Sequence, residues 1–107
     1  MDKEKCYISG KIGGLPFLQA VNNFNEGERI VRDSLKMDPV NPLNNGIRPS
    51  RPWIIHMIVD LYMMIQCDHV LFLPNWETSR GARIEYRVAK FLGMEMWMAP
   101  DKEEKIE

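Results

Sequence analysis

Apolar residues along the chain follow two patterns that alternate with each other. Short continuous apolar runs are typical of buried parallel strands, and they occur at residues 5–9, 69–73 and 94–98. A brief further strand is expected around Val40. Apolar residues at helical spacing mark three segments, which are residues 16–35, 52–66 and 80–92. This alternation predicts an α/β fold with a doubly wound parallel sheet of about four strands.

The first helical segment carries its apolar residues at 3.6-residue spacing, at Phe17, Ala20, Val21, Phe24, Val31 and Leu35. Gly27 and three asparagines weaken the middle of this helix, because glycine and asparagine are poor helix formers. The segment at residues 42–52 holds three prolines, two adjacent asparagines and a glycine, so it is expected to be a loop. A loop of this length in a small domain is often functional or mobile.

The helix at residues 52–66 is apolar on nearly every face. One stripe is formed by Ile54, Met57, Ile58, Leu61 and Ile65, and further apolar side chains lie elsewhere on it, at Ile55, Val59, Tyr62 and Met63. A helix of this kind must be buried on more than one side. Since a chain of 107 residues can hardly cover it twice, we expect a homodimer, with Tyr62 or Met63 at the contact.

The composition narrows the class of protein. The chain has 14 basic and 15 acidic side chains, a net charge of −1, and 45% apolar residues. We expect a single domain over residues 1–107 with a charged tail at residues 101–107, because a domain needs on the order of 100 residues to build its core. The absence of a basic excess argues against a nucleic-acid polymer as partner.

The placement of cysteine and histidine predicts neither a disulfide framework nor a metal site. Cys6 and Cys67 lie 61 positions apart, and His56 and His69 complete no cluster with ligand spacing. The most apolar stretch, residues 53–67, is interrupted by polar residues and is too short to span a bilayer comfortably. No apolar signal segment begins the sequence. We therefore expect a cytoplasmic protein that has no membrane partner.

Glu85 is the most informative single residue. On a helical wheel it falls inside the apolar stripe of its helix, whose other members are Gly81, Ile84, Val88, Ala89 and Leu92. A carboxylate on an apolar face costs free energy unless it is paired, ligating or catalytic. The competing interpretation is a boundary glutamate whose carboxylate reaches solvent or an arginine. Periodicity alone leaves both interpretations open.

Several other residues have both a functional and a structural interpretation. Asp60 lies one turn after His56, and an exposed pair at this spacing is the simpler account of both residues. Ser79 opens the helix at residues 80–92, where it and Gly81 suit either an ordinary N-cap or the binding of a phosphate. Gly10 follows the first strand in a loop that matches no dinucleotide or ATP motif. If the first and third strands are neighbours, these loops meet where ligands bind in such sheets.

Three segments together resemble the nucleoside 2-deoxyribosyltransferase superfamily, which includes the 2′-deoxynucleoside 5′-monophosphate N-glycosidases. The resemblance extends from Lys5 to about Met98 and is strongest to a compact bacterial and phage branch. It is carried by YISGKIGG at residues 7–14, by Asp60 with Asp68 eight residues later, and by SRGARIE at residues 79–85. It implies a flavodoxin-like, Rossmann-like fold and a nucleoside or nucleotide as the small-molecule substrate, without metal or cofactor.

The resemblance also implies a role for each matching residue. Glu85 matches the nucleophile that attacks the anomeric carbon, and Asp60 matches the acid that assists departure of the base. Tyr7 matches a tyrosine near the reacting sugar. Ser79 and Gly81 match the turn that holds the 5′ end of the substrate, and Gly10 joins them among the substrate-binding positions. The implied activity is therefore an N-glycosidase or a 2-deoxyribosyltransferase.

The chain also departs from the family pattern. Gly13 stands where some monophosphate N-glycosidases carry a basic residue, so the recognition of a 5′-phosphate is left open. The loop at residues 41–52 has no role that the resemblance assigns, and its Arg48 and Arg51 are candidates to reach a phosphate. Two further hypotheses therefore stay open. One is a non-catalytic nucleotide-binding or sensing domain of the same fold, and the other is a small interaction subunit whose apolar helix docks a partner.

Overall fold

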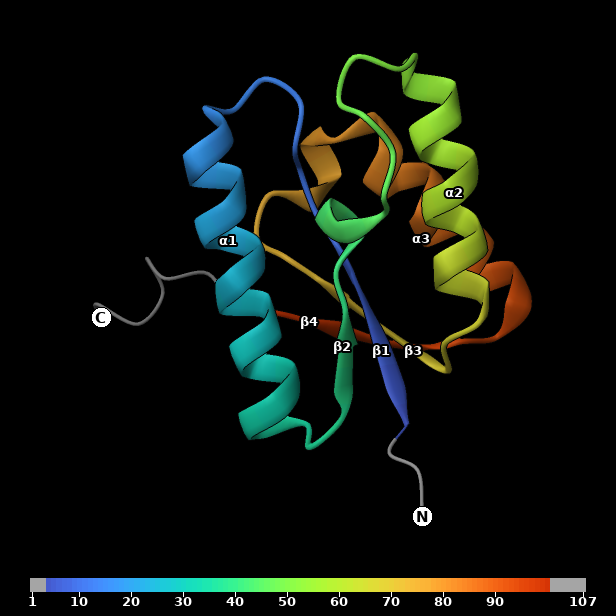
Figure 1. Ribbon diagram of the computed structural model, residues 1–107. Helices are drawn as coiled ribbons and strands as arrows, with labels where there is room; N and C mark the ends of the chain where they lie inside the picture. The colour runs from blue at the N-terminus through green and yellow to red at the C-terminus, as the bar shows by residue number, and fades with distance from the viewer. Residues whose placement is uncertain (1–3, 101–107) are drawn as a thin grey trace.

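The computed structural model describes residues 4–100, so the expected charged tail at residues 101–107 lies outside the described residues. The centre of the domain is a four-stranded parallel sheet in the order β2-β1-β3-β4 (Figure 1). The strands are β1 Lys5–Ser9, β2 Asp38–Val40, β3 His69–Phe72 and β4 Glu95–Met98. The predicted α/β, doubly wound, flavodoxin-like architecture is confirmed. The predicted neighbours β1 and β3 also pair, from Cys6 beside His69 to Ser9 beside Phe72.

Helices cover both faces of the sheet. Helix α1 (Phe17–Arg29) lies on one face, and helices α2 (Trp53–Ile65) and α3 (Arg80–Leu92) lie on the other (Figure 1). Strand β1 serves both sides, because successive side chains of a strand point to opposite faces. Cys6 and Ile8 pack with Phe24 of α1, whereas Tyr7 packs with Met64 of α2 and Ala89 of α3.

Helix α1 passes through Gly27 without a break and continues as a π-helical segment, Ile30–Ser34. Gly27 is buried because α1 approaches the sheet closely at this point. A Cβ added there would lie 2.9 Å from Cδ2 of Leu73 and 3.1 Å from Cγ2 of Ile8. The expected apolar stripe of α1 was wrong at Phe17, which is 69% exposed at the start of the helix.

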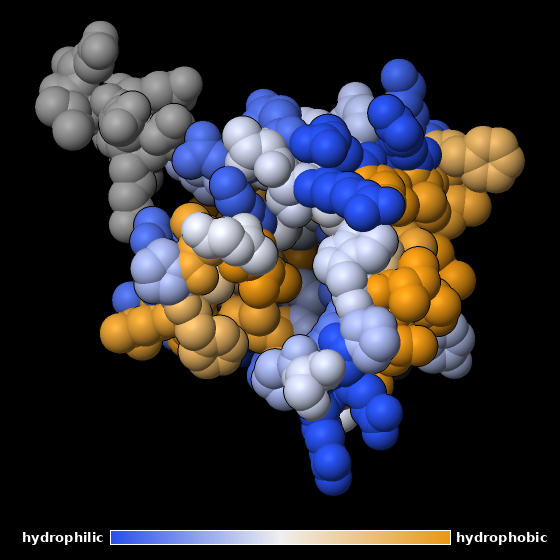
Figure 2. All heavy atoms as spheres, turned by 90° about the horizontal axis from the view of Figure 1, so that it is seen from above, coloured by the Kyte–Doolittle hydropathy of each residue, from blue (hydrophilic) through white to orange (hydrophobic). Residues whose placement is uncertain are grey.

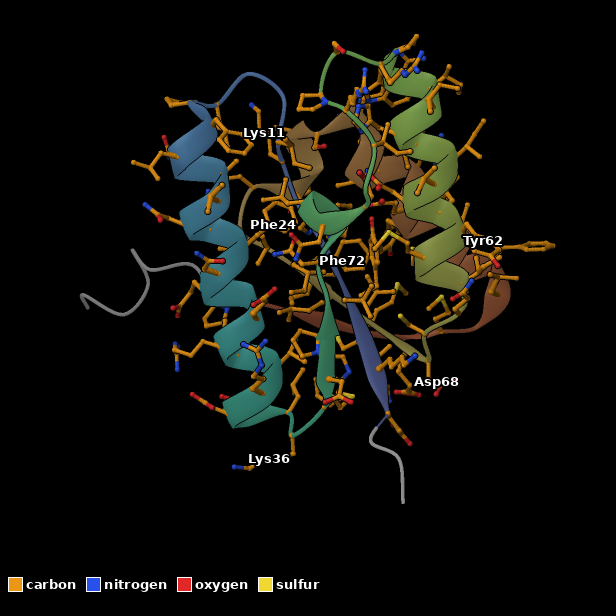
Figure 3. All side chains as sticks on the ribbon, viewed as in Figure 1. Lys11, Phe24, Lys36, Tyr62, Asp68 and Phe72 are labelled. Atoms are coloured by element: carbon orange, nitrogen blue, oxygen red, sulfur yellow. The ribbon has the colours of Figure 1, made fainter. Side chains whose placement is uncertain are left out.

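The apolar stripe of α2 coincides only in part with the buried side of this helix. Ile54, Ile58 and Ile65 are about half exposed, and the positions that face the sheet are Met57, Asp60 and Met64. We call the exposed apolar side of α2, formed by Ile54, Ile58, Tyr62 and Ile65, the α2 outer face. Tyr62 points outward from this helix, away from the sheet (Figure 3). The homodimer expected from this helix stays a prediction.

Helix α3 begins and ends as its sequence predicts. The Ser79 side chain accepts a hydrogen bond from the Ala82 N–H at 3.2 Å, and Gly93 closes the helix in the left-handed conformation with φ 73°. The buried positions are Ala82, Glu85 and Ala89. Two members of the expected stripe, Glu85 and Ala89, are therefore buried, and three more are partly buried, namely Gly81, Ile84 and Val88. Its last member, Leu92, is about half exposed, so this part of the expectation was wrong.

The segment between β2 and α2 is a loop, as expected, apart from a short 3-10 helix at Pro42–Asn44. Among residues 4–100, no helix has the length and apolar character needed to cross a membrane.

Candidate active site

A cavity of about 1000 Å³ lies at the carboxyl ends of β1 and β3. Figure 2 views this end of the molecule and shows a hollow near its centre, bordered by apolar and polar side chains. The six residues singled out from the sequence all line this cavity: Tyr7, Gly10, Asp60, Ser79, Gly81 and Glu85. Residues that are far apart in the sequence are therefore brought together at the crossover between β1 and β3, where open α/β sheets bind their ligands.

Glu85 lies deep in this cavity and is only 5% exposed. The Tyr7 hydroxyl donates a hydrogen bond to its Oε2 at 2.6 Å, and the Ser9 hydroxyl donates one to its Oε1 at 2.6 Å. The interpretation of Glu85 as a boundary residue that reaches solvent or an arginine is therefore wrong. Both oxygens of the carboxyl group are held by hydroxyls from strand β1.

Burial raises the pKa of Glu85 to about 7, because the protein interior disfavours the charged form. The hydrogen bonds from Ser9 and Tyr7 act in the opposite direction, and the charge of Asp60 adds to the upward shift. The pKa of Tyr7 is also raised well above its usual value, first by burial and then by the charge of Glu85. The tyrosine therefore acts as a hydrogen-bond donor at neutral pH.

Asp60 faces the same cavity from α2 and is 9% exposed. Burial raises the pKa of its carboxyl, and a hydrogen bond from Asn45 and the charge of His56 oppose that shift. The bond from Asn45 Nδ2 to Asp60 Oδ1 measures 2.9 Å. The simpler account of Asp60 as half of an exposed pair with His56 was wrong, because Asp60 lies on the inner side of the helix and is held from the loop.

Gly10, Ser79 and Gly81 have structural reasons for their identity as well as a place in the cavity. A Cβ on Gly10 would lie 2.8 Å from Cδ1 of Leu73, and a Cβ on Gly81 would lie 3.3 Å from Sδ of Met57. Ser79 caps helix α3, as described above. Their part in substrate binding stays a prediction, although each borders the space that a substrate would fill.

Two residues that hold the carboxyl groups of the site were not found from the sequence. The Ser9 hydroxyl donates a hydrogen bond to Glu85. The sequence did contain a signal for this residue, because Ser9 lies two positions after Tyr7 on a strand and therefore faces the same side of the sheet. Asn45 bonds Asp60 from the loop. Nothing in the sequence could have placed Asn45 there, since a loop rich in proline and asparagine has no periodicity from which to infer a face.

The cationic residues near the mouth come from two segments. Arg51 of the loop lines the cavity, and the Arg80 guanidinium lies 4.5 Å above the Trp53 ring, where it is attracted by the ring's negative face. Asp68, which was part of the sequence resemblance, lies at the opposite end of β3 from the cavity (Figure 3). Within residues 4–100, no group of three or more His, Cys, Asp and Glu side chains is arranged to hold a metal ion.

Comparison with models of protein families identifies the family of the chain. Residues 4–98 match the model of a family described as "Domain of unknown function (DUF4406)". Among curated proteins, none matches the chain.

Proposed function

For this chain, which belongs to the DUF4406 family, we propose cleavage of the N-glycosidic bond of a nucleoside or nucleotide, by hydrolysis or by transfer of the deoxyribosyl group. The observation that carries the proposal is the environment of Glu85. This buried carboxyl is held by Tyr7 and Ser9 and faces a large cavity that also holds Asp60. The resemblance to the nucleoside 2-deoxyribosyltransferase superfamily assigns the same two carboxyls to catalysis.

The two carboxyl groups suit the two tasks of the reaction. In the first step, a Glu85 oxygen forms a bond to the anomeric carbon while the carbon–nitrogen bond breaks and its electron pair leaves with the base. Asp60, in its protonated form, delivers a proton to the departing base, and burial favours that form by raising the pKa of the carboxyl. In the second step, water or an acceptor base attacks the same carbon, gives its proton to Asp60 and releases Glu85.

The proposed reaction uses no metal or cofactor. We propose that the enzyme is a homodimer and acts in the cytoplasm. The proposed catalytic residues are Glu85, Asp60 and Tyr7. Gly10, Ser79 and Gly81 are the proposed substrate-binding group. Gly10 follows β1, and Ser79 and Gly81 lie where α3 begins at the cavity. Free N–H groups at the start of a helix attract an anionic group of a substrate.

The test is incubation with a panel of 2′-deoxynucleosides and their 5′-monophosphates, with chromatography of the released base. Glu85→Gln retains the size of the side chain but removes the nucleophile, so base release is expected to fall by orders of magnitude while binding survives. Asp60→Asn is expected to slow release most for poor leaving bases, because they depend most on the delivered proton. The matched control is Glu95→Gln on exposed strand β4, which is expected to keep full activity.

A covalent adduct of deoxyribosyl mass on Glu85, trapped from a slow substrate, would directly support the nucleophile assignment. Full activity in Glu85→Gln, or no release from any member of the panel, would contradict it. The second candidate is a non-catalytic nucleotide-binding domain. It is favoured by the fact that both Glu85 oxygens already accept hydrogen bonds from the protein, as in a structural carboxyl. Tight nucleotide binding without base release would select this candidate.

A further inference from the structure

The loop between β2 and α2 is fastened to α2 through the side chain of Asn45. Its Nδ2 atom donates to Asp60 Oδ1 at 2.9 Å and lies 3.4 Å from Nδ1 of His56. Its Oδ1 atom accepts a hydrogen bond from the N–H of Ile47 at 2.9 Å. The amide of Asn45 therefore joins the turn of the loop to two side chains of the helix.

His56 takes part in this attachment in a defined tautomer. Its Nε2 atom lies 3.0 Å from the carbonyl oxygen of Arg48. A carbonyl oxygen can only accept, so Nε2 carries the hydrogen and donates it. In the neutral ring Nδ1 is then an acceptor, and it faces the amide nitrogen of Asn45. The loop is thus held at Arg48 by the ring and at Asn45 by both helix residues.

The same loop forms part of the cavity wall. Leu43, Gly46 and Ile47 line the cavity, as does Asn45 itself. The Nδ2 atom of Asn45 already faces Asp60 Oδ1 and His56 Nδ1, so its two hydrogens are directed at protein groups and not at a substrate. The residue is therefore placed to act on the reaction through Asp60 rather than by direct contact.

We propose that Asn45 is a positioning residue that fixes the Asp60 carboxyl and ties its orientation to the position of the 41–52 loop. This inference rests on the proposed role of Asp60 as the acid. Because Asn45 donates to Oδ1, the protonated form of Asp60 carries its hydrogen on Oδ2. Asn45 thereby selects the oxygen that delivers the proton to the departing base.

The charged and titratable groups around Asp60 set the direction of the expected effects. Glu85 of α3 and Tyr7 of β1 interact with it across the cavity, and His56 lies on its own helix. Among these influences, the bond from Asn45 favours the ionised carboxylate and lowers the pKa of Asp60. Removing this donor must therefore raise that pKa.

The first experiment measures the pKa of Asp60 without any substrate. The side-chain carboxyl carbon of Asp60, assigned by its loss in Asp60→Asn, is titrated by NMR in the full chain. We expect a higher pKa in Asn45→Ala than in the wild type. We also expect a higher pKa in Asn45→Asp, which retains an acceptor for the Ile47 N–H but replaces the donor by a carboxylate. The control is Asn23→Ala on the exposed side of α1, where no change is expected.

The second experiment measures base release as a function of pH. Both Asn45 variants are expected to lower kcat roughly ten- to a hundredfold, since a small displacement of a catalytic group costs up to about a hundredfold. The alkaline limb, where activity is lost as Asp60 ionises, is expected to move to higher pH. A residue that only shapes the loop would leave Asn45→Asp close to the wild type, because that variant retains the turn.

The outcomes separate this inference from the proposed function. An unchanged Asp60 titration in Asn45→Ala, or an equal shift in Asn23→Ala, would overturn the positioning role whether or not the protein releases base. The pKa of Asp60 could be raised in both Asn45 variants while the wild-type protein releases no base. That result would support the positioning of Asp60 by Asn45 and refute the proposed glycosidase activity.

Discussion

The carboxyl group of Glu85 links the stability of the protein to pH. Its pKa is raised to about 7 in the folded protein, mainly by burial, from the ordinary value of 4.5. The folded state therefore holds this proton more tightly than the unfolded chain does. The stabilising contribution is complete below about pH 4.5 and is lost as the pH rises through 7.

Glu85→Gln is accordingly expected to gain stability over the wild type as the pH rises. Each pKa unit corresponds to about 1.4 kcal/mol, so the free energy of unfolding should shift in favour of the variant by about 3 kcal/mol between pH 4 and pH 8. Urea unfolding at several pH values measures this difference. Glu95→Gln controls for the loss of one charge at an exposed site. A stability difference that is constant with pH would contradict the buried, proton-holding state of Glu85.

Ser9 offers a second test at the same carboxyl. Its hydroxyl donates to Glu85 Oε1 and lowers the pKa of Glu85, so Ser9→Ala is expected to raise that pKa further. Under the proposed mechanism Glu85 must be ionised, and the acid limb of base release should therefore move to higher pH. The pH profile of kcat checks this, with Ser34→Ala at an exposed position as control. An unmoved acid limb in Ser9→Ala would show that Ser9 does not tune the nucleophile.

The burial of Glu85 could be predicted from the sequence, whereas the burial of Asp60 could not. Glu85 stood out because it interrupts an apolar stripe, and the structure confirms that it is buried. Asp60 lies on a helix that is apolar all round, so periodicity could not tell which side faces the sheet. Its partner Asn45 comes from a loop, whose path depends on contacts between distant segments rather than on local pattern.

At the scale of elements, the strands and helix ends were predictable and the helix faces were only partly so. Helix α3 begins after Ser79 and ends at Gly93, because serine is a preferred N-cap and glycine a preferred C-terminal residue of helices. Both signals can be read directly from the sequence. The buried side of α2 is instead formed by Met57, Asp60 and Met64, and it depends on contacts with distant segments of the chain. The sequence signal failed there because isoleucines and methionines occupy both sides of the helix.

Gly27 shows how one position can fix the distance between two elements. Alanine is the better helix former by about 1 kcal/mol, but its Cβ would press on Leu73 and Ile8 beneath α1. Overpacking typically costs about 1–3 kcal/mol, so Gly27→Ala is expected to destabilise the protein by about 1 kcal/mol in urea unfolding. In Gly13→Ala the added Cβ meets nothing within 4 Å, and little change is expected. Stabilisation by Gly27→Ala would mean that α1 lies farther from the sheet.

At the scale of the whole molecule, the α2 outer face is an exposed apolar surface that lies along one side of a single helix. Ile54, Ile58, Tyr62 and Ile65 are each at least half exposed along one side of a single helix. Contiguous exposed apolar residues of this kind mark interaction surfaces. Helix α2 also carries Asp60 on its opposite side, so a contact made on the outer face would bear on the helix that holds the proposed acid.

The homodimer expected from this helix can be tested by placing a charge on the α2 outer face. Tyr62→Asp is expected to convert a dimer to a monomer in sedimentation at micromolar concentration, because an unpaired charge buried in an interface costs more than the contact gains. Leu18→Asp is the matched control, since Leu18 is also a largely exposed apolar residue but lies on α1, across the sheet. It is expected to leave the dimer intact. If the wild type sediments as a monomer, the exposed face must serve a different partner. If both variants dissociate the dimer, the contact is not confined to the α2 outer face and includes α1 as well.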